Sequence, residues 1–124
     1  MNPFLAVIDL SGAPLGAEAL TPSLPGLAQA DTPGEMMLRN DWGAAWAPSP
    51  DRNRPAVLHR HGVLAVGDVR ITNRRSLPSV GAGATPVVAD LALVVDHYRR
   101  RGVDGLGDLV GDFSFVLWDA PRRR

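Results

Sequence analysis

The sequence predicts an α+β fold in a single domain over residues 1–124. Residues 90–101 carry apolar side chains at helical spacing and end in three arginines before a glycine, which is typical of an amphipathic helix. Residues 113–118 are apolar on both faces of an extended strand, and such a strand has to be covered on both sides. This pattern favours a sheet packed between a helix layer and a second sheet.

Short apolar runs bounded by turn residues predict the strands that precede the helix. Residues 4–10 form a run of strand length that ends at Ser11 and Gly12. Residues 13–35 include four prolines, so we expect a loop there with at most one or two helical turns. Further strands are predicted for 42–47, 56–61 and 63–71, and a short helical turn for 103–110.

The helix is predicted to begin at Asp90, whose carboxylate is of a type that caps helices. Residues 81–85 have the glycine content of a phosphate-binding loop, but they lack its lysine. Pro86 follows them, so we expect no helix to open directly from this segment and interpret it as a linker.

Composition argues against several classes of function. The formal net charge is zero, which provides no field to attract nucleic acid or a membrane surface. The chain has no cysteine, so it has neither disulfides nor thiolate metal sites. No apolar run approaches the roughly 20 residues that span a bilayer, and the start of the sequence lacks the basic region and cleavage site of a signal peptide. We therefore expect a cytoplasmic protein without nucleic-acid or membrane partners.

Two local patterns resemble binding sites, but we interpret both as ordinary structural features. His59 and His61 alternate on a predicted strand without an evident third ligand, so we interpret them as strand residues and predict no metal site. The arginine triplets at 99–101 and 122–124 lack interleaved aromatic residues, which favours a solvated helix end and tail over an RNA-binding surface.

Three blocks of the chain are similar, in order and in spacing, to the N-terminal glutaminase domain of the asparagine synthetase family, a class II glutamine amidotransferase-type domain. The blocks are Phe4–Asp9, Gly67–Leu77 and the stretch from Asp90 to Phe113. The resemblance implies an Ntn-hydrolase-like four-layer αββα sandwich. It also implies that only the N-terminal part of the sandwich is here, because the family continues with further strands after the position of Asp119.

The resemblance implies a glutamine pocket without its catalytic group. In the family, removal of the initiator methionine leaves an N-terminal cysteine, which attacks the glutamine amide with its own α-amine as base. Asn2 stands at that position. A carboxamide is not a nucleophile, and Asn2 is too large a neighbour for ready removal of Met1. We therefore expect no catalytic residue and no glutaminase activity from this chain.

The other pocket positions are altered in part. Asp68 stands where the family has an asparagine of the oxyanion hole, and its carboxylate would repel a developing oxyanion. Arg70 stands where the family has a glutamate that binds the substrate ammonium, and its guanidinium would repel that ammonium. Asn73 and Asp90 keep their family identities, although Asn73 could equally hold a turn. Either Arg70 forms a structural ion pair with Asp68 or Asp90, or the pocket still binds a ligand. In both cases we expect these residues to lie close together.

These departures resemble the ring-forming branch of the family, the β-lactam synthetases and the lasso-peptide macrolactam synthetases or cyclases, which need no ammonia. The resemblance implies a pseudoenzyme domain that supports the synthetase domain of an ATP-dependent amide- or lactam-forming ligase. This chain would hold no cofactor, and ATP and Mg²⁺ are expected only in the synthetase domain.

Two alternatives remain open from the sequence. The chain could be a fragment of an ordinary glutamine-hydrolysing asparagine synthetase, or a stand-alone interaction module that pairs with a separate synthetase chain. The strand 113–118, apolar on both faces, further predicts either a homo-oligomer formed through exposed strands or an aggregation-prone chain.

Overall fold

The chain is a mixed α+β protein. A computed structural model describes residues 4–11, 15, 34–39, 43–48, 56–77 and 86–124. Along the described residues the elements are β1 (Leu5–Ile8), β2 (Gly34–Arg39), β3 (Gly43–Pro48), β4 (Ala56–Arg60), β5 (Val63–Ile71), the 3₁₀ helix η2 (Arg74–Ser76), α2 (Pro86–Arg101), the 3₁₀ helix η3 (Val103–Asp108) and β6 (Gly111–Asp119).

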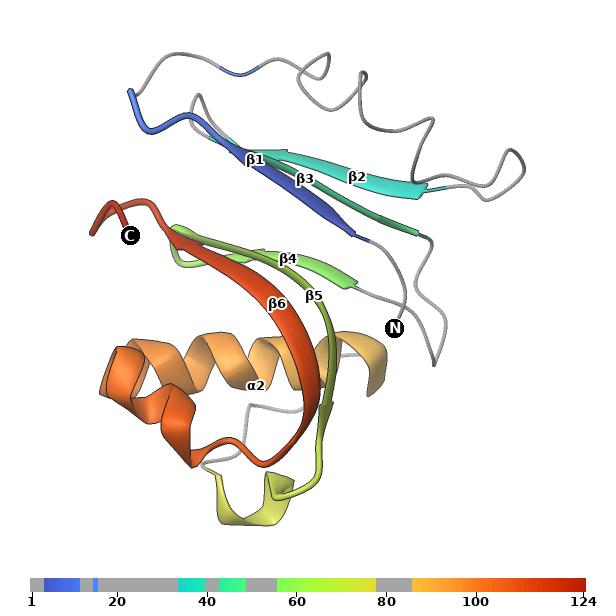
Figure 1. Cartoon of the computed structure of the whole chain (residues 1–124), viewed down its shortest axis with the longest axis vertical. Coiled ribbons are helices and arrows are strands. Elements are labelled where there is room, and N and C mark those ends of the chain that lie inside the picture. The colour runs from blue at the N-terminus through green and yellow to red at the C-terminus, as the bar shows by residue number, and fades with distance from the viewer. Residues whose placement is uncertain (1–3, 12–14, 16–33, 40–42, 49–55, 78–85) are drawn as a thin grey trace.

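Two antiparallel sheets and a helix form three stacked layers (Figure 1). The first sheet has the order β1-β3-β2 and the second the order β4-β5-β6. Helix α2 packs on the face of the second sheet that is turned away from the first (Figure 1). The second sheet therefore lies between a helix and another sheet, as the two-faced apolar pattern predicts. Residues 16–33 lie outside the described residues, so a fourth layer on the first sheet stays a prediction.

Strand β5 shows why the middle layer has to be apolar on both faces. Its side chains alternate, and Leu64 and Val66 join the core between the two sheets while Val63 and Ala65 join the core under α2. Trp118 of β6 contributes to the first of these cores. Each fully buried valine or leucine contributes about 1.5–3 kcal/mol relative to an exposed one, so both faces of this sheet favour the layered arrangement.

Most predicted elements are confirmed within a few residues, with corrections at β2 and at the start of α2. The sequence patterns do not predict β2, because its Gly-Glu-Met-Met start lacks β-branched and aromatic residues; pairing with β3 makes it a strand. Helix α2 begins at Pro86 and not at Asp90. Proline suits the first helical position, where no intrahelical partner for its missing N–H is needed. The prediction that Pro86 prevents a helix from starting there is therefore wrong. Asp90, predicted as the first residue, lies inside the helix. The linker predicted at 81–85 lies outside the described residues.

Candidate functional site

The predicted pocket residues are divided between the two faces of the second sheet. Asp68 and Arg70 have the strand parity of Leu64 and Val66, which places them on the face toward the first sheet. Arg70 is exposed and Asp68 half-buried, and their cross-strand neighbours on β6 are Asp112 and Ser114. Asp90 comes from α2, on the opposite side of this sheet (Figure 1). Asn2 lies outside the described residues.

Asp90 pairs with Arg74, so the predicted pair with Arg70 is not formed. The Asp90 side chain is buried, and its Oδ2 lies 2.6 Å from Nη2 of Arg74. The same oxygen accepts a hydrogen bond of 3.1 Å from the backbone N–H of Ile71. Arg70 and Ile71 are adjacent and point to opposite faces, which takes the Arg70 side chain away from the helix layer. The prediction that Arg70 and Asp90 form one cluster is therefore wrong.

The geometry of β5 explains why a helix carboxylate is needed at Ile71. Strand β4 pairs with β5 only as far as Gly67, so among the described residues the last part of β5 has β6 as its one strand neighbour. A buried backbone N–H has to find an acceptor, and Asp90 supplies it. The second oxygen of Asp90, Oδ1, is buried without a hydrogen-bond partner among the described residues. Oδ2 of Asp90 thus accepts two hydrogen bonds, whereas Oδ1 accepts none from the described residues.

Asn73 holds a turn. Its Nδ2 donates to the carbonyl oxygen of Asp108 at 2.8 Å, and its Oδ1 accepts from the backbone N–H of Val110 at 3.0 Å. These two bonds join the turn after β5 to the loop between η3 and β6. Of the two roles weighed for Asn73 in the sequence, the hydrogen bonds favour the structural one.

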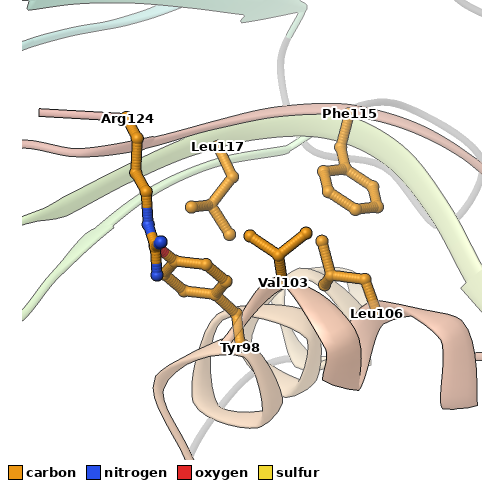
Figure 2. Close-up of a pocket in the computed structure, with 6 residues that line it drawn as sticks. All are labelled: Tyr98, Val103, Leu106, Phe115, Leu117 and Arg124. Carbon is orange, nitrogen blue, oxygen red and sulfur yellow. The ribbon is translucent and has the colours of Figure 1, made fainter. Parts of the chain in front are cut away.

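The arrangement also contains an apolar pocket that the sequence did not indicate. The pocket has a volume of about 220 Å³ and lies between α2, η3 and β6. Figure 2 shows its six lining residues, Tyr98, Val103, Leu106, Phe115, Leu117 and Arg124. Phe115 and Leu117 project from β6 toward the side chains of the two helical elements (Figure 2). A hollow of this kind depends on where η3 meets the sheet, which strand periodicity does not encode.

A hydrogen-bonded cluster adjoins this pocket through Tyr98. The Asp119 side chain is fully buried, and its Oδ2 accepts hydrogen bonds of 2.8 Å from both the Tyr98 hydroxyl and Nη1 of Arg122. Burial acts to raise the pKa of Asp119, but the hydrogen bonds from Arg122 and Tyr98 outweigh it and leave this pKa below its usual value. Arg124 lies over the Tyr98 ring, 5.9 Å from its centroid, and adds a cation to an otherwise apolar lining.

His97 links helix α2 to η3. His97 on α2 is buried, and its Nε2 lies 3.1 Å from Oδ2 of Asp108 in η3, an oxygen that Arg101 also reaches at 3.1 Å. His59 lies on β4, whereas His61 occupies the following turn with a φ of 54°. In the part of the chain that the structure describes, no group of three or more histidine, cysteine, aspartate or glutamate side chains is arranged to hold a metal ion.

No protein-family model, curated protein or solved structure matches this chain. No helix among the described residues is long and apolar enough to cross a bilayer. Among the described residues, the two features with chemical consequences are the buried Asp90 carboxylate, which Arg74 already occupies, and the apolar pocket beside β6.

Proposed function

We propose that this chain is a glutaminase-inactive, Ntn-like domain that supports the synthetase domain of an ATP-dependent amide- or lactam-forming ligase of the asparagine synthetase type. The proposal comes from the three sequence blocks that resemble that family. One structural observation supports the loss of glutaminase chemistry. Asp90, which matches the family's pocket aspartate, is buried and already bound to Arg74 at 2.6 Å.

The Arg74–Asp90 pair bears directly on glutamine binding. A glutamine substrate that used the Asp90 carboxylate would have to displace the Arg74 guanidinium from Oδ2, which leaves a charge to be solvated elsewhere. Arg70, whose charge would repel an ammonium at the position of the family's glutamate, lies on β5 with its side chain on the face away from Asp90. Together with the absence of any thiol from the chain, these charges favour a supporting role over hydrolysis.

A second candidate is a stand-alone module that binds a separate synthetase chain. The observation that favours it is the exposure of large apolar residues near β6, where Phe113 and Val116 are 37% and 38% exposed. Such residues at the edge of a sheet are suited to pairing with another polypeptide. The two candidates differ only in whether the synthetase domain is covalently linked.

The test is reconstitution with the synthetase polypeptide encoded in the same reading frame or by a neighbouring gene. We expect ATP-dependent pyrophosphate release to require this chain, while glutamine yields no ammonia above a blank without protein. The matched control is the synthetase polypeptide alone. Ammonia release by this chain, or full synthetase activity without it, would contradict the proposal.

A further inference from the structure

Among the described residues, the outer edge of β6 is open from Phe113 to Leu117. At the end of the strand the backbone of Asp119 is hydrogen-bonded to that of Arg124, at 2.7 Å from the Asp119 N–H to the Arg124 carbonyl oxygen. Strand β6 runs for nine residues and is the terminal strand of the order β4-β5-β6. Backbone groups that point away from β5 then have no strand partner among the described residues. A long edge of this kind recruits another strand unless charges, proline or a bulge protect it, and residues 113–118 contain none of the charged or proline residues that would do so.

The side chains along this edge are apolar and incompletely covered on both faces. Phe113 is 37% exposed on the face toward α2, and Val116 is 38% exposed on the opposite face. Phe115 and Leu117, on the same face as Phe113, line the pocket of about 220 Å³. Small-molecule sites usually have about 300–1,000 Å³, so the size of this pocket is better suited to a side chain from a neighbouring strand.

Charges at the two ends of β6 indicate which strand fits. Asp112 is exposed near the beginning of the strand, opposite Arg70 of β5. Arg123 and Arg124 are exposed just after its end, where they also donate to the Leu10 carbonyl and the Tyr98 hydroxyl. A second β6 that runs antiparallel brings its basic C-terminal turn to the same end of the seam as Asp112, and its own Asp112 to the end that holds the arginines. A parallel copy would instead place like charges together, which is unfavourable. Of the two orientations, these charges therefore favour the antiparallel one.

We propose that two copies of this chain pair through β6, antiparallel and related by a two-fold axis, so that the β4-β5-β6 sheets join into one six-stranded sheet. Residues of equal strand parity have to oppose each other if both helix layers are to lie on the same side. A register centred on Phe115 satisfies this condition. It places Phe113 of each copy opposite Leu117 of the other, against the apolar pocket. The inference uses the same β6 surface as the second candidate function, with a second copy of the chain in place of the synthetase polypeptide.

The first test measures the mass of the intact chain by sedimentation over a concentration series. We expect twice the monomer mass, and we expect Phe113→Glu to weaken the dimer by about tenfold or more, because it places a charge in the seam. Leu10→Glu is the matched control, since Leu10 is 67% exposed and follows β1 in the other sheet; this variant should dimerise normally. A monomeric parent chain, or an undiminished dimer in Phe113→Glu, overturns the proposal.

A second test covers the case in which Phe113→Glu fails to fold. In the proposed register Ser114 of one copy opposes Val116 of the other, and directly opposed strand residues have Cα separations that a disulfide can bridge. The chain has no cysteine of its own, so a mixture of Ser114→Cys and Val116→Cys chains should oxidise to a heterodimer more completely than either variant alone. A dimer without this cross-link overturns β6 pairing. A monomer that extends its sheet only with the synthetase polypeptide would assign the edge to that chain and overturn self-pairing.

Discussion

The Tyr98 hydroxyl donates a hydrogen bond of 2.8 Å to Oδ2 of Asp119, and this bond joins α2 to the end of β6. Both side chains are buried, so neither can replace its partner with water at little cost. The bond fixes the end of the edge strand against the helix layer and forms one wall of the apolar pocket. The stability of the second sheet therefore depends on this bond.

Tyr98→Phe should destabilise the chain by about 1.5–3 kcal/mol, the usual range for a hydrogen bond to a charged group. Phenylalanine keeps the aromatic ring, so the decrease in the free energy of unfolding measures the contribution of the hydroxyl hydrogen bond. Urea unfolding measures the change, and Arg100→Ala, an exposed change on the same helix, should stay within about 0.5 kcal/mol of the parent. Equal stability of Tyr98→Phe and the parent would mean that the hydroxyl contributes nothing to holding β6.

Acid should destabilise the chain through Asp119. Its pKa is lower in the folded chain than the usual value of 3.8, so the stabilisation is fully present above that value and is lost as the pH falls through the folded pKa. Thermal unfolding between pH 2 and 6, on the order of the range that carboxylates titrate, measures this loss. Asp119→Asn should be less stable at neutral pH and should lose less stability in the acid range. An unchanged acid profile in Asp119→Asn would contradict the assignment.

Gly67→Ala should disturb the pairing of β5 with β6. A Cβ at Gly67 would lie 2.5 Å from the Cβ of Phe115 and 2.5 Å from the carbonyl oxygen of Ser114, so the strand backbone itself would have to move. We expect a cost of about 1–3 kcal/mol, typical of overpacking, in a denaturant titration. Gly107→Ala is the control, because a Cβ there meets nothing within 4 Å. Similar stability of the two variants would rule out the close approach at Gly67.

Asp90→Ala should expose the backbone N–H of Ile71 to exchange, because that group loses its acceptor. The expected cost is about 1–3 kcal/mol for an unsatisfied buried donor. Asp90→Asn keeps an acceptor oxygen and should protect the Ile71 amide better. Amide hydrogen exchange followed by NMR distinguishes the variants. Equal protection of Ile71 in both would show that the carboxylate does not serve the strand.

Asn2→Cys alone should not produce a glutaminase. The substituted chain would regain a thiol, but Asp68 and Arg70 would still oppose the oxyanion and the substrate ammonium, and Arg74 would still occupy Asp90. Ammonia release from glutamine is the measurement, and intact mass, which should show Met1 retained in the parent chain, is its control. Detectable turnover would mean that the resemblance has assigned these positions wrongly.

The amino-acid sequence by itself determined the α+β class and the strands 63–71 and 113–118. It also determined the helix that ends at Arg101, before Gly102, and the burial of a sheet on both faces. These features follow from side-chain periodicity, which depends on near neighbours in the chain. The resemblance to the synthetase family also rests on sequence blocks and their spacing, and the loss of a nucleophile at Asn2 stays a prediction from it.

Only the tertiary structure decided how the polar residues are used. Arg74 and Asp90 are 16 residues apart and Tyr98 and Asp119 are 21 apart, so their pairing depends on how α2 lies against the second sheet. Strand parity could have indicated that Arg70 faces away from the helix layer, but not that Arg74 would turn back to meet it. The pocket beside β6 likewise exists because η3 meets the sheet there, a contact set by packing between elements that no local pattern specifies.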